Sequence, residues 1–185
     1  QRIGIECLPL ALLAVYVFWP RIDPTLSKAI AFVSLCVCIN ATLQDLPGWL
    51  LDSIVGIAAC ALYLHTLAPG MLPADAGEFQ LVSAVLGIAH PPGYPLYTLL
   101  GKLVTLLPVG DVAYRVNLLS AIVGALTLIM VCRTVGRATG DNKAGVIAAV
   151  SLGVAATFWA QSTTANIRGL TALLTVLPIY FLISY

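Results

Sequence analysis

The sequence predicts an all-α integral membrane protein, with about six transmembrane helices and two short interfacial or re-entrant helices in one long loop. Composition is the first reason: 60% of the 185 residues are hydrophobic and 9% are charged, whereas an average soluble domain has about 25% charged residues. The second reason is that long apolar segments recur along the chain, separated by short turn sequences. Because this small number of charged residues could not cover the surface of a soluble domain, we expect the protein to lie in a lipid environment.

Six apolar segments approach the length of about 20 residues that a helix needs to cross a bilayer. They are residues 3–19, 26–43, 49–67, 112–132, 143–161 and 167–185. Asp111 directly precedes the fourth segment and is expected to cap that helix. The first two segments form an N-terminal region, residues 1–48, and the other four form a membrane core, residues 49–185.

The connection over residues 68–110 is much longer than the others. It contains two apolar stretches, residues 77–88 and 95–107, that are too short to span comfortably and predict interfacial or re-entrant helices. Long structured loops among short ones usually carry function. The basic residues Arg133, Arg137 and Lys143 cluster between the fourth and fifth spans and predict that this turn is cytoplasmic. The long loop is then expected on the outer side of the membrane.

Two carboxylates mark the beginning of the first short helix. Asp75 and Glu78 are three residues apart, so both can face the same side of a helical turn. One interpretation is simple capping of the helix N-terminus. The other is a carboxylate pair at the membrane surface, where partial desolvation raises a pKa and suits a general base. The sequence leaves both open.

His90 begins the second informative stretch, which reads H-P-P-G-Y-P-L-Y. Its prolines and glycine restrict the backbone, so His90, Tyr94 and Tyr97 are expected to be held in a rigid turn. Rigid presentation of polar side chains is typical of a binding site. A lone histidine without this setting would more often be structural.

Further polar residues lie close to the predicted membrane boundary. Arg115 and Asn117 come early in the fourth span, and Asn166 and Arg168 come at the beginning of the sixth. Polar groups near spans usually face the protein interior or water, and they are candidate substrate contacts. Arg168 could bind an anionic group such as a lipid phosphate. The alternative is an arginine that snorkels from a helix end.

Several function classes have no support in the sequence. The formal net charge is +1, so there is no basic surface of the kind that binds nucleic acid. The five cysteines lie in apolar segments without a CxxC pair, which predicts small buried hydrophobes and no metal site. Phosphate-binding and hydrolase signatures such as GxxxxGK[ST], HExxH and GxSxG are absent. Small residues near Gly124 and Gly145 predict close helix packing.

Three motifs in this region carry a resemblance to a known family. They are D-x-G-E-F at residues 75–79, H-P-P-G-Y-P-L at 90–96 and R-V-N-L-L-S at 115–120. The block resembles a large bacterial family of polytopic membrane proteins that is related to the GT-C glycosyltransferases, and whose animal members look like protein O-mannosyltransferases. The resemblance continues more weakly through the F-W-A-Q segment at residues 158–161.

The resemblance implies a GT-C-like N-terminal membrane core that takes a sugar from a polyprenyl-phosphate donor at the outer face of a bacterial inner membrane. In that architecture the first outer loop carries an acidic residue that activates or positions the acceptor, which here would be Asp75 with Glu78 beside it. His90, Tyr94 and Arg168 would be candidates to bind the donor phosphate or the sugar. The donor is a lipid, so no nucleotide-sugar fold is required, and a divalent metal could take part.

One departure from the family pattern supports a second hypothesis. Family members usually read A-E-V-Y where this chain has Ala165, Asn166, Ile167 and Arg168. Asn166 therefore stands where the family has a carboxylate, and Arg168 stands where it has an aromatic residue. The alternative function is therefore a non-catalytic accessory subunit that uses the same scaffold to pack against other membrane protein subunits.

Overall fold

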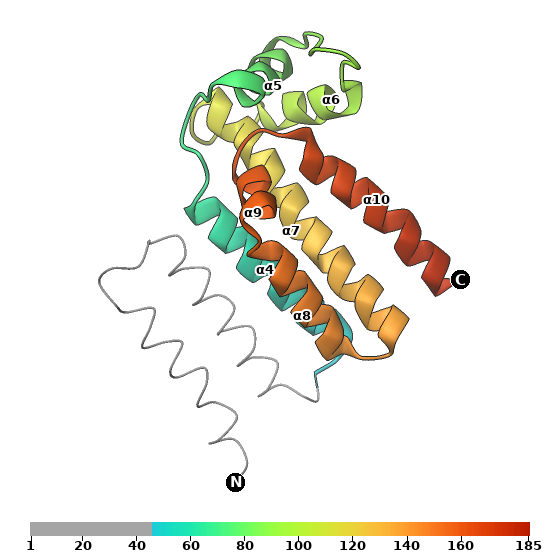
Figure 1. The fold of residues 1–185 in the computed structure, drawn as a ribbon. Coiled ribbons are helices and arrows are strands. Elements are labelled where there is room, and N and C mark those ends of the chain that lie inside the picture. The colour runs from blue at the N-terminus through green and yellow to red at the C-terminus, as the bar shows by residue number, and fades with distance from the viewer. Residues whose placement is uncertain (1–45) are drawn as a thin grey trace.

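The computed structural model describes residues 46–185, and over this range it contains helices and no strand (Figure 1). The two spans predicted at residues 3–19 and 26–43 lie outside the described residues. The helices in chain order are α4 (Gly48–His65), α5 (Ala74–Val85), α6 (Pro95–Val104), α7 (Val112–Thr139), α8 (Asn142–Gly153), α9 (Ala156–Thr163) and α10 (Ile167–Ser184).

Three of these helices, α4, α7 and α10, are long and apolar enough to cross a membrane. The bent pair α8 and α9 adds a fourth candidate span if the pair is counted as one. The described part of the chain is therefore an all-α membrane fold with three to four candidate spans.

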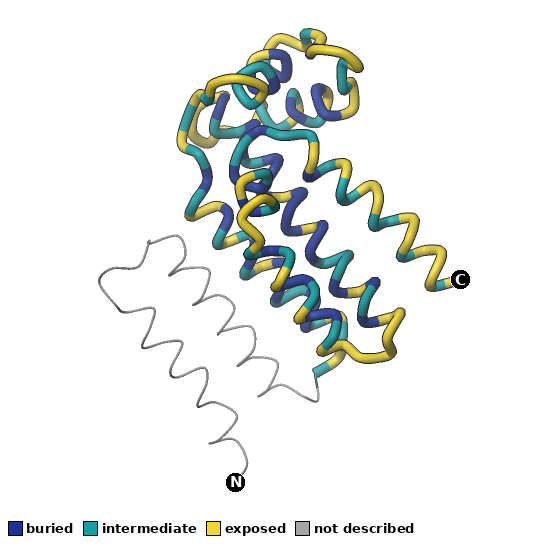
Figure 2. The backbone as a smooth tube through the Cα atoms, viewed as in Figure 1, coloured by how far each residue is buried: buried dark blue, intermediate teal, exposed yellow. Residues whose placement is uncertain are grey.

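Helix α7 is the centre of the bundle. It packs against each of the other six described helices, and buried residues follow one another along its length (Figure 2). Helices α4 and α8 cover it on one side, while α10 lies on another and, among the described helices, packs mainly against α7. Against the described residues only Gly169 of α10 is buried and half of the helix residues are exposed, so this apolar helix has a wide surface for contact with lipid or with other protein segments.

The predicted packing at small residues is confirmed. A Cβ atom added to Gly145 on α8 would collide with the backbone carbonyl oxygen of Cys132 on α7. A Cβ atom added to Gly124 on α7 would lie 2.5 Å from the Ser162 Oγ atom on α9. Glycine at these positions lets the helices approach closely, as is common between helices in membranes.

The fifth segment was predicted as one helix over residues 143–161, and this is wrong. The chain bends by 70° between α8 and α9. The hydroxyl of Tyr63 on α4 donates a hydrogen bond of 2.8 Å to the Gly153 carbonyl at the break. This bond satisfies a carbonyl that has lost its helical partner.

Several predicted boundaries also move. The fourth span was expected to end at Cys132, but α7 continues to Thr139 and stops at Gly140, which adopts φ +69. The arginines of its last two turns fit the negative end of the helix dipole, so they do not end the helix. The first short helix was expected over residues 77–88, whereas α5 begins at Ala74 and ends before Leu86, which has a left-handed backbone. The second begins at Pro95 as predicted and ends at Val104, earlier than residue 107.

Helices α5 and α6 form a separate layer across one end of the bundle (Figure 1). They pack against each other and onto the N-terminal part of α7. Phe79 of α5 and Tyr97 of α6 are buried in one apolar cluster with Val116 of α7 and Ala165, which precedes α10. This layer positions the residues that the sequence singled out.

Candidate functional site

Asp75, Glu78 and His90 converge at the outer edge of the α5–α6 layer. Asp75 and Glu78 lie on the first turns of α5, and His90 lies in the turn that leads to α6. Each residue offers one ligand or proton-transfer atom, and these atoms lie within 4.8 Å of one another. We call these three residues the acidic–histidine cluster.

Glu78 and His90 are held together by two hydrogen bonds. The His90 backbone N–H donates to Glu78 Oε1 at 2.7 Å, and His90 Nδ1 lies 2.7 Å from Glu78 Oε2. The hydrogen bond with Glu78 raises the pKa of His90 above its ordinary value of 6.5. The same contact lowers the pKa of Glu78 below 4.5. Each partner thus favours the charged form of the other.

Asp75 is the unpaired carboxylate of the cluster among the described residues. It is exposed, and no side chain caps the N-terminus of α5. Asp75 is therefore not the N-cap residue, but it lies in the first turn of α5, where a carboxylate suits the helix dipole, so the simpler interpretation stays open beside the catalytic one. Its carboxylate is left available for a proton, a hydroxyl group or a cation.

The glycine of the D-x-G-E-F motif has a packing role. A Cβ atom on Gly77 would collide with the Leu72 carbonyl oxygen. Only glycine therefore allows the chain before α5 to pass so close to the first turn, which carries Asp75 and Glu78. The motif combines two reactive side chains with the residue that permits their backbone geometry.

Aromatic rings form the floor beneath the cluster. The Phe79 ring lies 5.8 Å from His90, 5.5 Å from Tyr94 and 5.2 Å from Tyr97, measured between centroids. These distances and tilted geometries are favourable for aromatic pairs. Tyr97 is buried, and its burial raises the pKa of the phenol to about 12. Tyr94 is only half-buried, so it is the tyrosine with better access to a bound molecule.

Asn117 lies fully buried at the centre of a hydrogen-bond network. Its Oδ1 accepts from Gln80 Nε2 and from the Ala165 backbone N–H, both at 2.9 Å. Its Nδ2 donates to the Ala68 carbonyl at 2.8 Å. Asn117 thereby ties the beginnings of the long loop and of α10 to α7, beneath the cluster.

Arg115 faces the connection between α6 and α7. Its guanidinium group donates to the carbonyl oxygens of Val109 at 2.6 Å, Thr105 at 2.8 Å and Gly110 at 3.0 Å. The structure thus places Arg115 in contact with backbone carbonyls and gives it no contact with the acidic–histidine cluster. Asp111 caps α7 as predicted, because its carboxylate accepts from the Tyr114 backbone N–H at 2.7 Å.

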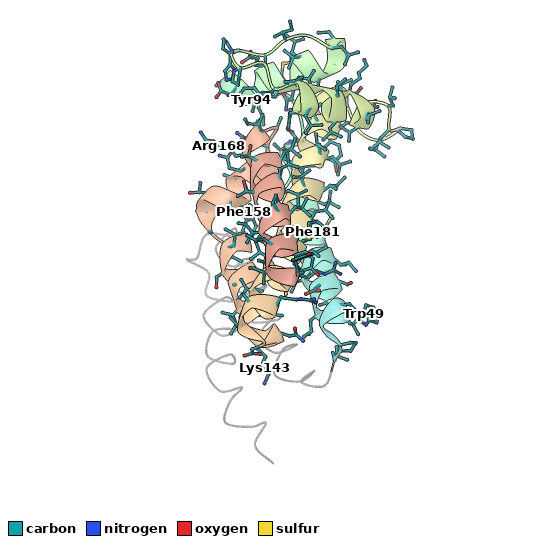
Figure 3. All side chains as sticks on the ribbon, turned by 90° about the vertical axis from the view of Figure 1, so that its right-hand side faces the viewer. Trp49, Tyr94, Lys143, Phe158, Arg168 and Phe181 are labelled. Carbon is teal, nitrogen blue, oxygen red and sulfur yellow. The ribbon has the colours of Figure 1, made fainter. Side chains whose placement is uncertain are left out.

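Asn166 and Arg168 begin α10. The Asn166 side chain accepts from the Arg168 backbone N–H at 2.9 Å and so caps this helix. The Arg168 side chain is exposed and has no hydrogen bond or ion pair within residues 46–185. Figure 3 shows Arg168 on the same side of the molecule as Tyr94, just below the α5–α6 layer.

An apolar groove begins at Arg168 and follows α10. It has a volume of about 610 Å³ and lies between α10, α7 and the C-terminal part of α8. It is lined by Thr127, Val131, Leu152, Ile167, Arg168, Thr171, Ala172, Thr175, Val176 and Ile179. Arg168 is the only charged residue among them, so the groove combines one cation at its end with an apolar wall.

Sequence reasoning missed Gln80, which directly follows the D-x-G-E-F motif. Its side chain bonds Asn117 and the backbone of Gly70 and Leu72, so it holds the loop against α7. A polar residue on the buried side of an otherwise apolar helix was the available signal.

The acidic–histidine cluster could hold a divalent cation. Carboxylate oxygens and an imidazole nitrogen are common ligands for transition metals. The His90 Nδ1 atom is already bonded to Glu78, so a metal would have to displace this contact or bind the other ring nitrogen. The mixed donor set fits zinc or manganese better than magnesium.

Comparison with known proteins gives a consistent answer. Residues 75–185 match the family model described as the N-terminal domain of protein O-mannosyl-transferase TMEM260. The chain is 40% identical over 128 residues to the mouse protein named protein O-mannosyl-transferase TMEM260, covering 68% of this chain and 18% of the relative. It is 30% identical over 106 residues to the Dictyostelium discoideum protein of the same name, covering 56% of this chain and 13% of the relative. The matched part is thus less than a fifth of either relative, and no solved structure matches the chain.

Proposed function

Because this chain belongs to the TMEM260 N-terminal domain family, we propose that it carries the acceptor-activating part of a GT-C-type glycosyltransferase that uses a polyprenyl-phosphate sugar. The membrane fold and the named relatives support a glycosyltransferase-like membrane protein. The donor, the GT-C mechanism and the position of residues 68–110 on the outer side are our proposals. The main observation in support of these proposals is that the acidic–histidine cluster lies at the same end of the bundle as Arg168, the charged residue that lines the apolar groove.

Asp75 is the proposed general base. An acceptor hydroxyl hydrogen-bonded to Asp75 would attack the anomeric carbon of the donor sugar while the bond from that carbon to the phosphate oxygen breaks. The hydroxyl proton passes to the Asp75 carboxylate, and the electron pair of the broken bond leaves with the lipid phosphate. Proton removal by a positioned carboxylate typically contributes a factor of about 10²–10⁴ in rate.

Glu78 and His90 have a positioning role in this mechanism. The negative charge of Glu78 and the positive charge of protonated His90 partly cancel. Asp75 is then the one unpaired charge of the cluster, which reduces the repulsion between the cluster and the phosphate of the donor. The Phe79 ring below them contacts both His90 and Tyr94. The exposed His90 imidazole and the half-buried Tyr94 ring of this turn are suited to packing against a sugar.

Arg168 and its groove are the proposed donor site. A polyprenyl chain is apolar and long, which fits a groove whose wall is made almost entirely of apolar side chains and threonine methyl groups. The exposed Arg168 guanidinium would bind the phosphate that leaves. If a divalent cation binds the cluster, Asp75, Glu78 and His90 would hold it, and it would supply further positive charge for the leaving phosphate.

The test is transfer from a polyprenyl-phosphate mannose donor by the full chain with its natural partners in the membrane. Asp75→Asn is expected to lower kcat by a factor of about 10² or more, because it removes the base. Asp141→Asn is the matched control: it makes the same chemical change at the opposite end of the bundle and retains the cap of α8, since asparagine caps as well as aspartate. If both variants keep full activity, the catalytic proposal is wrong, and the accessory-subunit alternative is favoured.

A further inference from the structure

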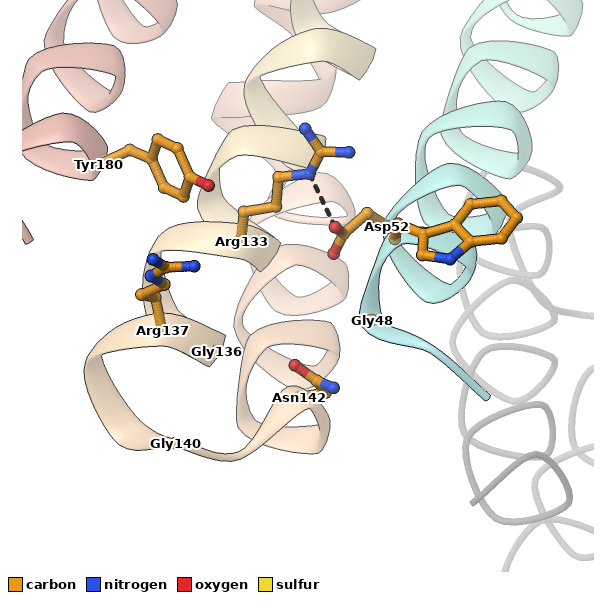
Figure 4. Close-up of a pocket in the computed structure, with 9 residues that line it drawn as sticks. Gly48, Asp52, Arg133, Gly136, Arg137, Gly140, Asn142 and Tyr180 are labelled. Carbon is orange, nitrogen blue, oxygen red and sulfur yellow. Dashed lines mark hydrogen bonds and ion pairs between the residues drawn. The ribbon is translucent and has the colours of Figure 1, made fainter. Parts of the chain in front are cut away.

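The opposite end of the bundle holds a polar pocket that the proposed transferase mechanism does not use. It has a volume of about 510 Å³, and Figure 4 shows it between α4, α7, α8 and α10. It is lined by Gly48, Trp49, Asp52, Arg133, Gly136, Arg137, Gly140, Asn142 and Tyr180. We call it the basic pocket.

We propose that the basic pocket binds the phosphate headgroup of an acidic glycerophospholipid from the adjacent membrane leaflet. This site shares no lining residue with the donor groove, which is lined on α10 by residues from Ile167 to Ile179, whereas α10 contributes Tyr180 to the basic pocket. The proposal therefore does not depend on the transferase reaction.

One stripe of α7 forms the floor of the pocket. Arg133 and Arg137 are four residues apart and Gly136 lies three residues after Arg133, so these residues share one face of α7, and Gly140 follows directly after the end of the helix. Gly136 is buried against Asn142 of α8, whereas a Cβ atom added to Gly140 would have no neighbour within 4 Å, so the open space lies beside Gly140. The floor is therefore a cationic surface with room above it.

The charges in the pocket leave an excess of positive charge. Asp52 is buried on α4 and accepts a hydrogen bond of 2.8 Å from Arg133 Nε. This ion pair accounts for one of the two arginines. Arg137 has no hydrogen bond or ion pair within residues 46–185, so two cations face one carboxylate. A bound anion would neutralise the remaining positive charge of Arg137.

Neutral donors surround the same space. Figure 4 shows the Tyr180 hydroxyl directed from α10 toward Arg133, with Arg137 one turn below. The N-terminus of α4 also contributes, because Pro47 provides no side-chain cap and Gly48 and Trp49 are the first residues of that helix. Backbone N–H groups at a helix N-terminus bind phosphate readily. Arginine, hydroxyl and backbone donors together match the oxygens of a phosphate diester.

The location favours a lipid over a dissolved phosphate. The pocket is built from the ends of three candidate membrane spans, α4, α7 and α10. Trp49 lines the pocket and is 62% exposed, and tryptophan is enriched at the headgroup level of membranes. Phe181 and Ile183 are exposed on the adjoining part of α10 and provide an apolar surface for acyl chains. Basic pockets between spans on the cytoplasmic side typically bind anionic headgroups.

Native mass spectrometry of the full chain in mild detergent tests the proposal, with phosphatidylserine, phosphatidylcholine and inorganic phosphate as probes. We expect phosphatidylserine to bind about tenfold or more tightly than phosphatidylcholine, whose quaternary ammonium group would face Arg137. Arg137→Gln should weaken phosphatidylserine binding about tenfold, because a charge-assisted contact is lost. Tyr180→Phe removes only a hydroxyl group and should weaken binding by a factor of roughly five.

Lys143→Gln is the matched control, because Lys143 is a basic residue exposed at the same end but outside the pocket. It should leave phosphatidylserine binding unchanged. Equal losses in Arg137→Gln and Lys143→Gln would show that only general surface charge attracts the lipid, and the proposal would be wrong. It would also be wrong if inorganic phosphate displaced phosphatidylserine from the pocket at similar concentrations. Should Arg137→Gln not fold, an unchanged affinity in Tyr180→Phe would overturn the proposed contacts.

Discussion

Glu78 accepts two hydrogen bonds from His90, one from the backbone N–H and one from the imidazole ring, although twelve residues separate them. The backbone bond fixes where the loop returns to α5, and the ring bond fixes the orientation of the imidazole. His90 is thereby placed beside Asp75. These two hydrogen bonds therefore join the D-x-G-E-F motif, which contains Glu78, and the H-P-P-G-Y-P-L motif, which begins with His90, in one site.

The order of the loop before α6 should depend on pH through this pair. The pKa of Glu78 is lowered from 4.5, so its contribution to stability is present above pH 4.5 and is lost as pH falls through the lowered pKa. The pKa of His90 is raised from 6.5, so its contribution is present below pH 6.5 and is lost as pH rises through the raised pKa. The protection factors of the amides in residues 86–94, which correct the exchange rate for its intrinsic pH dependence, should be highest between pH 4.5 and 6.5. Glu78→Gln should flatten this dependence, and a wild-type exchange profile in that variant would contradict the assignment.

Asn117→Ala should destabilise the protein by about 2–4 kcal/mol, because it leaves the Gln80 amide and the Ala165 N–H buried without their acceptor. Thermal unfolding in detergent would measure the loss. Asn142→Ala is the control, since Asn142 is exposed and its replacement should change stability by less than about 0.5 kcal/mol. Similar melting temperatures for the two variants would mean that the Asn117 network does not support the fold.

The sequence predicts much of this architecture because its signals are local. Asp111 is a capping residue directly before an apolar segment, and it caps α7. Asp75 and Glu78 were expected on one turn at a helix start, and they lie there. These features depend on residues within one helical turn, where spacing determines geometry.

Other features could not be predicted because their causes lie far away in the sequence. No proline marks the bend between α8 and α9. The bend instead involves a hydrogen bond from Tyr63, ninety residues before Gly153. The partners of Asn117 likewise come from three separate segments. The roles of His90, Tyr94, Tyr97, Arg168 and the other site residues in binding remain predictions for experiment.

Gly145→Ala should weaken the packing of α8 on α7 by about 1–3 kcal/mol. The new methyl group would meet the Cys132 carbonyl, which belongs to the backbone of α7 and cannot move away as a side chain can. Gly56→Ala on α4 is the matched control, because its new methyl would collide with side-chain atoms alone, Cδ1 and Cγ1 of Ile129, and this side chain can change rotamer. Thermal unfolding should therefore show a larger loss for Gly145→Ala. A larger loss for Gly56→Ala would contradict this account.

Divalent cations should bind at the acidic–histidine cluster with an affinity that falls as pH drops, because protonation of His90 removes a ligand nitrogen. Titration of the metal-free protein with Zn²⁺ or Mn²⁺ by calorimetry would measure this affinity. His90→Gln should weaken binding at least about tenfold, whereas His65→Gln should have no effect, since His65 lies on α4 outside the cluster. Equal effects of the two variants would assign the bound metal to another site.

Arg168→Gln should raise the KM for a polyprenyl-phosphate donor and lower kcat, because the arginine is proposed to bind the phosphate both before and after it leaves. Lys102→Gln would not be a suitable control for the loss of one positive charge, because the Lys102 ammonium group donates to the Ala84 carbonyl and supports the α5–α6 layer. Arg168→Lys is the better comparison, because it keeps the charge but loses the bidentate geometry of the guanidinium group, so it should restore part of the donor affinity.

Steady-state kinetics with donors of different chain length would separate binding of the phosphate by Arg168 from binding of the lipid chain in the groove. A shorter lipid should raise KM similarly in wild type and in Arg168→Gln if the groove binds the chain independently of the arginine. If KM does not depend on chain length, the groove along α10 does not hold the donor, even if Arg168 binds its phosphate.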